Sequence, residues 1–193
     1  GLIYNHASWV RHRQQERRYP FLKADDYLDG AEISDKVNFI YACLKDISIP
    51  LIRKLKSDRT AVLLIDTYNK HGYAEQRRLF VSLMEHECKV PVVIGRAYQQ
   101  LTPERLQLYA ATDVGGLLID GLGDGVFLAA ENCGPDKVVN ETAFNILQAT
   151  RTRISKTEYI SCPSCGRTLF DLQETTAKIR SRTNHLKGIK IAI

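Results

Sequence analysis

The chain has 193 residues, of which 44% are hydrophobic, 25% charged and 8% aromatic, and this ordinary globular composition excludes a wholly disordered, collagenous or coiled-coil chain. Its formal net charge of +5 is far below that of a dedicated nucleic-acid-binding protein. Its apolar runs are shorter than the ~18 residues of a membrane helix, so we expect neither nucleic acid nor a membrane as a partner.

The first 59 residues are predicted to form a helix-rich N-terminal part of the larger domain. Ser34 is a suitable N-cap residue for a helix. That helix would place four apolar side chains on one stripe, namely Val37, Ile40, Tyr41 and Leu44. Pro50 then opens a second short amphipathic segment, Leu51 to Leu55.

From residue 60 to about 152 the pattern changes to short apolar runs of strand length. Runs begin at Val62, Val92 and Gly116, which are 30 and 24 residues apart, and helical patterns separate them. This is the spacing of βα units, so we expect parallel strands joined by helices. A further apolar run, Val126 to Ala130, precedes a helical pattern from Lys137 to Arg151. The fold class predicted for this region is α/β, as part of a TIM-barrel-like domain.

Residues 157–193 are predicted to be the truncated start of a second α/β domain. Glu158 to Ile160 has the pattern of a strand, a helix is expected from about Leu169 to His185, and Gly188 to Ile193 alternates like a second strand. A β-α-β segment of this size cannot bury a core of its own. We therefore expect the chain to be a fragment of a longer enzyme.

The sequence Cys162-Pro-Ser-Cys165 is the most specific chemical signal. Two thiolates at this spacing can bind a zinc ion, form half of an iron–sulfur site, or act as a redox pair, and the spacing leaves the three possibilities open. Cys43, Cys88 and Cys133 lie near apolar helical stretches and are interpreted as small buried side chains. The odd number of cysteines favours reduced thiols in an intracellular, cytoplasmic protein.

Polar residues after the expected strands form a second group. If Asp66, Arg96 and Asp120 all follow parallel strands, they share the rim where α/β proteins place their sites. The glycine-rich turn Gly121 to Gly125 has the composition of an anion-binding loop. The favoured interpretation is structural: the glycines permit tight turning, and Arg96 pairs with a carboxylate.

The segment from Tyr159 to Leu172, YISCPSCGRTLFDL, resembles the opening of the cluster domain of the hydroxymethylbutenyl diphosphate synthase family. Residues 18–26 and 113–124 look like the longer, three-domain form, in which a barrel-like middle domain precedes the cluster domain. The resemblance covers nearly the whole chain. It implies an oxidoreductase of the methylerythritol phosphate route to isoprenoids.

In that family a 4Fe-4S cluster is held by three Cys and one Glu, and the resemblance assigns Cys162 and Cys165 as the first two metal ligands. The other ligands would lie beyond Ile193, and no catalytic residue is assigned within this segment. The resemblance further implies ferredoxin or flavodoxin as the electron donor, and a cyclic diphosphate as the substrate that is reductively opened and dehydrated. A plant protein of this family would be located in plastids.

One departure from the family separates this segment from a catalytic barrel. Where the shorter bacterial enzymes carry an Arg and a Ser that hold phosphate, this sequence has Phe127 and Ala129. A phosphate clamp needs a cation and a hydrogen-bond donor, which these two side chains lack. The segment is therefore predicted to be an inactive spacer. The alternatives are a zinc-stapled α/β binding module and a glutaredoxin-like thiol oxidoreductase that uses Cys162 and Cys165.

Overall fold

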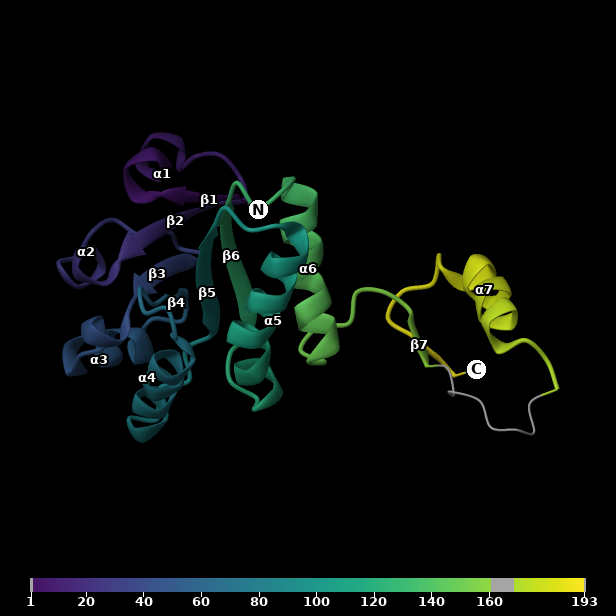
Figure 1. The fold of residues 1–193 in the computed structure, drawn as a ribbon. Coiled ribbons are helices and arrows are strands. Elements are labelled where there is room, and N and C mark those ends of the chain that lie inside the picture. The colour runs from purple at the N-terminus through teal and green to yellow at the C-terminus, as the bar shows by residue number, and fades with distance from the viewer. Residues whose placement is uncertain (1, 161–168, 193) are drawn as a thin grey trace.

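Six parallel strands form the main sheet of the computed structural model, which describes residues 2–160 and 169–192. Each strand pairs with the next one along the chain, and the sheet curls into a partial barrel (Figure 1). The strands are β1 (Leu2–Asn5), β2 (Arg18–Lys23), β3 (Asn38–Ala42), β4 (Ala61–Ile65), β5 (Val92–Gln99) and β6 (Gly125–Glu131). The α/β fold with TIM-barrel-like repeats that the sequence predicted is thereby confirmed.

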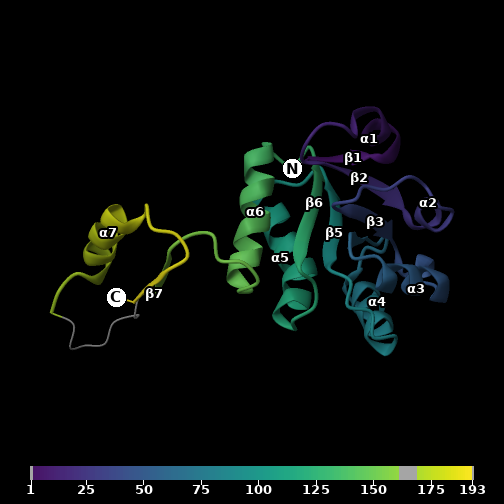
Figure 2. The same ribbon diagram turned by 180° about the vertical axis from the view of Figure 1, so that it is seen from behind.

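Helices connect the strands and cover one face of the sheet, as Figures 1 and 2 show from opposite sides. This one-sided arrangement follows because parallel neighbours are joined by crossovers of a single hand. The helices are α1 (His6–His12), α2 (Ala24–Leu28), the 3-10 turn η1 (Leu44–Asp46), α3 (Ile49–Ser57), α4 (Tyr73–Glu85), α5 (Pro103–Ile119) and α6 (Asp136–Ala149). Helix α5 begins with a side-chain cap: the Thr102 side chain accepts from the backbone N–H of Arg105, and Pro103 occupies the first turn.

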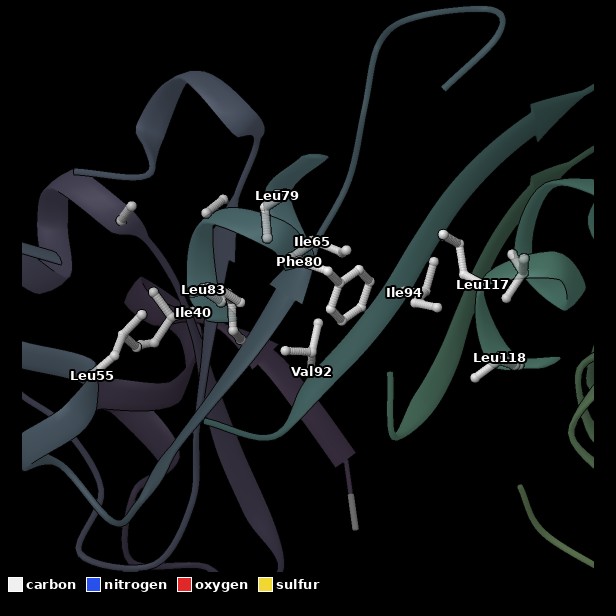
Figure 3. Packing of buried hydrophobic residues seen from close by; sticks show 14 of the residues in the cluster. Ile40, Leu55, Ile65, Leu79, Phe80, Leu83, Val92, Ile94, Leu117 and Leu118 are labelled. Atoms are coloured by element: carbon white, nitrogen blue, oxygen red, sulfur yellow. The ribbon is translucent and has the colours of Figure 1, made fainter. Parts of the chain in front are cut away.

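The hydrophobic core lies between the sheet and these helices (Figure 3). Alternate strand residues face it, so Ile40, Leu63 and Ile94 are fully buried. They pack with apolar residues of the helices, among them Leu55, Leu79, Leu83, Leu106 and Leu117.

The opposite face of the sheet carries a second set of alternating side chains that no helix of the described chain covers (Figures 1 and 2). We call it the open face, and it includes Phe21, Phe39, Tyr41, Leu64, Val93, Phe127 and Ala129. Phe127 remains 42% exposed. In a closed barrel this face would be the packed interior.

The prediction of a helix after Ser34 is wrong, because residues 38–42 form strand β3, which pairs with β2 and β4 in the middle of the sheet. Apolar residues at positions 37, 40, 41 and 44 fit a helical stripe, but the actual period is two. Asn38, Ile40 and Ala42 are fully buried toward the helices. Ser34 instead is a buried residue of a largely exposed loop, where the Asn38 side chain accepts from its N–H and donates to its carbonyl. The first 59 residues thus supply three strands besides their helices.

The strand expected at Gly116 to Ile119 is also wrong, because these residues complete helix α5. Leu106, Ala110, Val114 and Leu117 are fully buried and follow a helical repeat over the whole segment. Gly116 allows the close approach of the Tyr73 ring: an added Cβ would lie 2.9 Å from Tyr73 Cε2. The strand of this repeat is β6, in the apolar run that begins at Val126.

The C-terminal β-α-β unit comprises β7 (Glu158–Ile160), α7 (Leu172–Thr183) and β8 (Lys190–Ala192). The two strands pair in parallel, and the Tyr159 hydroxyl lies 2.8 Å from Thr183 Oγ1 of the helix. Helix α7 has no buried residue among those described, and Leu169 is 99% exposed. The unit stands apart from the main sheet in both views (Figures 1 and 2). It has the expected elements and no core of its own.

Within the described residues, no helix combines the length and the apolarity needed to cross a membrane.

Candidate functional site

Cys162 and Cys165, the predicted metal ligands, lie outside the described residues, on the connection between β7 and α7. Asp171 caps α7, and its carboxylate accepts from the backbone N–H of Glu174 at 2.9 Å. Residues 2–160 and 169–192 contain no cluster of three side chains able to hold a metal ion. The two cysteines therefore remain the metal-ligand prediction.

The other three cysteines are Cys43, Cys88 and Cys133. They are free thiols buried in the six-stranded sheet and its helices, which we call the barrel part, as the sequence predicted. Cys43 follows β3, and its Sγ lies 3.8 Å from the hydroxyl of Tyr41. Burial raises the pKa of the Cys43 thiol above its ordinary value. A thiol of this kind is a poor nucleophile at neutral pH, so it adds no redox function.

Asp66 lies at the carboxyl end of β4, on the predicted rim. Its carboxylate accepts from the Tyr41 hydroxyl at 3.3 Å, and the hydroxyls of Tyr41 and Tyr68 lie 3.1 Å apart. Burial raises the pKa of Tyr41, with the hydrogen bond to Tyr68 as the next cause, so the phenol stays protonated. The rim at β3 and β4 is a hydrogen-bonded group of phenols and one carboxylate, without a cation.

Arg96 lies on β5 but faces the helices, on the same side of the strand as Ile94 and Tyr98. Its Nη2 lies 3.0 Å from Asp113 Oδ2 of α5, and its other contacts are the backbone carbonyls of Asn69 and Lys70. The favoured interpretation, that Arg96 pairs with a carboxylate, is confirmed. Its partner, Asp113, was not predicted from the sequence. The signal was present, because a buried cation on an apolar strand requires a buried anion.

Tyr98 completes this buried network by donating to Asp113 Oδ2 at 2.8 Å. Burial raises the pKa of Tyr98, and the hydrogen bond to Asp113 adds to the rise. Burial is the largest single effect on Arg96 and opposes its charge, but attraction and hydrogen bonding to Asp113 together with Tyr98 raise the pKa of the guanidinium overall. The network links the β4–α4 connection to α5, and the Arg96 guanidinium is committed to Asp113 and to the two backbone carbonyls.

Asp120 does not share the rim with Asp66, which corrects the prediction. Because Gly116 to Ile119 is helical, Asp120 is the C-cap residue of α5 and lies before β6 rather than after a strand. Its carboxylate pairs with Arg77 of α4 and accepts from the Tyr73 hydroxyl at 3.5 Å. This exposed pair links two helices on the outer surface.

The glycine-rich turn from Gly121 to Gly125 leads from α5 into the amino end of β6, away from the rim where barrel sites lie. Asp124 anchors the turn: its N–H donates to the Val92 carbonyl at 2.7 Å, and its carboxylate accepts from the Val92 N–H at 2.8 Å. Gly121 and Gly123 have positive φ of 76° and 91°. These contacts support the structural interpretation of the turn over an anion-binding loop.

Gly123→Ala should destabilise the protein by about 2–4 kcal/mol, through left-handed backbone strain and a clash. An added Cβ would lie 2.7 Å from Ile94 Cδ1, in the core. Gly121→Ala is the matched control: it has the strain but no atom within 4 Å of its Cβ, so about 1 kcal/mol is expected. Urea unfolding measures both. Equal losses would show that the contact with Ile94 contributes nothing.

Phe127 and Ala129, which replace the phosphate-binding pair, lie on the open face. Their neighbours on β5 are Gly95 and Ala97. This part of the face therefore presents only small and aromatic side chains. It offers no cation and no hydroxyl to a phosphate group.

Curated proteins with similar sequences share one name, and no protein-family model matches the chain. A 4-hydroxy-3-methylbut-2-en-1-yl diphosphate synthase (flavodoxin) of Parabacteroides distasonis is 44% identical over 182 residues, covering 94% of this chain and 30% of the relative. The chloroplastic synthase (ferredoxin) of Arabidopsis thaliana is 52% identical over 118 residues, which are 61% of this chain and 16% of that relative.

A Leptospira interrogans synthase (flavodoxin) is 55% identical over 103 residues, covering 53% of this chain and 15% of the relative. The chain thus spans 30% or less of the length of these three relatives. It corresponds to a segment of such proteins, which confirms the resemblance found in the sequence.

Proposed function

We infer that this chain belongs to the 4-hydroxy-3-methylbut-2-en-1-yl diphosphate synthase family, and we propose that it joins the end of a barrel-like middle domain to the start of the cluster domain. The observation that carries the proposal is the 44% identity over 182 of the 193 residues, an alignment too long to be confined to the barrel part. On this basis residues 1–152 are the middle-domain part and residues 157–193 open the cluster domain.

The proposed parent reaction reduces a cyclic diphosphate, 2-C-methyl-D-erythritol 2,4-cyclodiphosphate, to the linear 4-hydroxy-3-methylbut-2-enyl diphosphate. Two electrons and two protons are consumed and one water is released. Flavodoxin and ferredoxin appear in the names of the relatives, so a protein of one of these kinds is the proposed electron donor. The plant relative is named chloroplastic, and plastids are the proposed location for a plant version of this chain, with the cytoplasm for a bacterial one.

Cys162 and Cys165 would supply two thiolate ligands of a 4Fe-4S cluster. Soft thiolates at this spacing suit iron–sulfur ligation, and in the sequence both cysteines fall between β7 and α7. A bound cluster supplies one-electron transfer and a Lewis-acidic iron. Two protein ligands do not complete such a site, so the remaining ligands must come from elsewhere in the full protein.

The barrel part is proposed to act as a spacer that holds the cluster domain in place. Arg96 is committed to Asp113 inside the core. The open face is apolar around Phe127, and Lys23 is the one cation that the strands of the described sheet place on it. Transfer of a diphosphate to such a surface without a paired cation carries a penalty of about several kcal/mol per charge.

The test compares the full-length synthase with this 193-residue chain, both reconstituted anaerobically with iron and sulfide. With a small chemical reductant, the full-length protein should form the linear diphosphate, while the chain alone should form none. Calorimetric titration of the chain with the cyclic diphosphate should show no saturable binding, with inorganic diphosphate as the control for nonspecific attraction.

Two results would contradict the proposal. An inactive, fully loaded full-length protein would refute the reaction. Micromolar binding of the cyclic diphosphate to the chain, not mimicked by diphosphate and lost in Lys23→Ala, would refute the spacer role. Zinc bound in place of iron would favour the zinc-stapled module, and a reversible Cys162–Cys165 disulfide without metal would favour the thiol oxidoreductase.

A further inference from the structure

The positive charge of the chain is concentrated in its C-terminal part. Residues 150–193 contain nine Lys and Arg and three Asp and Glu, a net charge of +6. Residues 1–149 contain 18 Lys and Arg residues and 19 Asp and Glu residues, a net charge of −1. The mildly basic character of the whole chain therefore belongs to the β-α-β unit and the linker before it, while the barrel part is close to neutral.

Most cations of this part point into solvent without a carboxylate beside them. The exposed cations with no acidic side chain within salt-bridge distance, among residues 2–160 and 169–192, are Arg153, Lys156, Arg180, Arg182 and Lys187. We call these five residues the basic surface. Three further cations of this part are paired: Lys178 with Glu174, and Arg151 and Lys190 with Glu158.

Aromatic rings hold two of these guanidinium groups in place. Arg180 lies over the Tyr159 ring at 5.3 Å, and Arg153 lies over the Phe144 ring at 5.4 Å. Phe144 also lines a groove together with Lys137, Lys156 and Lys187. The linker, the end of the barrel part and the turn after α7 thus bring cations to a common surface that also presents an aromatic ring.

We propose that the basic surface is the docking site for the reduced electron carrier, a small acidic redox protein. The proposal rests on the proposed function, because the relatives are named for a flavodoxin or ferredoxin donor. Such carriers bind through small, transient interfaces in which complementary charge raises the association rate. In the sequence Cys162 and Cys165 fall between β7 and α7, so a carrier on this surface would dock on the part of the chain that supplies the proposed cluster ligands.

The distribution of charge favours this partner over a polyanion or a membrane. A nucleic-acid site would need a stacking platform or a long basic track, whereas here Lys156 and Lys187 line one groove and the other cations are single side chains of the linker and of α7. The near-neutral barrel part would not attract an acidic carrier. Encounter complexes are therefore steered to the domain where the electrons are needed.

The test uses full-length, cluster-loaded synthase in which Lys156, Arg182 and Lys187 are all replaced with Gln. These three side chains make no ion pair within the described chain, so their replacement should leave the fold intact. The control variant removes the same charge from exposed positions of the barrel part, by Arg53→Gln, Arg59→Gln and Lys89→Gln. Product formation is followed with reduced flavodoxin or ferredoxin as donor, and separately with a small chemical reductant.

For the basic-surface variant, the KM for the protein donor should rise roughly tenfold at low salt, and the difference should shrink as salt is added. The rate with the small reductant should not change, and the control variant should match the wild type. An equal KM effect in the control, or an equal loss with the small reductant, would overturn the proposal. An oligonucleotide that competes with the carrier would assign the surface to nucleic acid instead. Failure of the wild type with the small reductant would refute the proposed function itself.

Discussion

Replacement of Cys162 with Ser in the full-length synthase is expected to abolish a stable cluster and to lower product formation by about two orders of magnitude or more. A serine hydroxyl is a harder and far less acidic ligand than a thiol, so it does not replace the soft thiolate on iron. Cys165→Ser should have the same effect. Iron and sulfide analysis after anaerobic reconstitution, together with the turnover rate, measures the loss.

The matched control for this prediction is Cys88→Ser. Cys88 is a free, buried thiol that packs in the hydrophobic core of the barrel part. Its replacement should cost about 1 kcal/mol of stability and leave the cluster content unchanged. A Cys162→Ser protein that retained a full complement of iron and sulfide would show that the ligands lie elsewhere, and the assignment of both cysteines would fall.

Strands β4 and β5 were predicted from the sequence, because each is followed by a clear helical pattern. β4 is a continuous apolar run and β5 begins with one, and the helix signals between them are distinct, so periodicity and spacing identified them. β3 was missed because five residues with an apolar side chain at most positions fit either period. What selects the strand is pairing with β2 and β4, which is a property of the tertiary fold.

The same limit explains the misplaced site residues. The apolar run at Gly116 to Ile119 resembles a strand locally, yet it is the last turn of a helix whose buried stripe begins at Leu106. This single error moved Asp120 from a helix end to the rim. The sequence predicted that Arg96 pairs with a carboxylate but did not identify which one, because Asp113 becomes its neighbour only when α5 packs on β5. The sequence motifs, by contrast, sufficed to identify the family. The assignment of Cys162 and Cys165 as metal ligands remains a prediction.

The buried network around Arg96 should contribute more to the stability of the barrel part than any other group of polar side chains. Arg96→Met is expected to lower the free energy of unfolding by about 3–5 kcal/mol. The side chains of Arg96 and Asp113 are only 8% and 21% exposed, so the variant leaves a largely buried carboxylate without its cation. The carbonyls of Asn69 and Lys70 lose a donor as well.

A double-mutant cycle separates the ion pair from simple packing. Arg96→Met combined with Asp113→Leu removes both charges, so the double variant should recover a large part of the loss, about 1–3 kcal/mol relative to Arg96→Met alone. Recovery should be incomplete, because the Tyr98 hydroxyl loses its acceptor at Asp113 and remains buried. Urea unfolding of the four proteins measures the coupling. Additive losses would mean that Arg96 and Asp113 act independently, and that the link to the β4–α4 connection depends on the backbone contacts of Arg96 rather than on its charge pair.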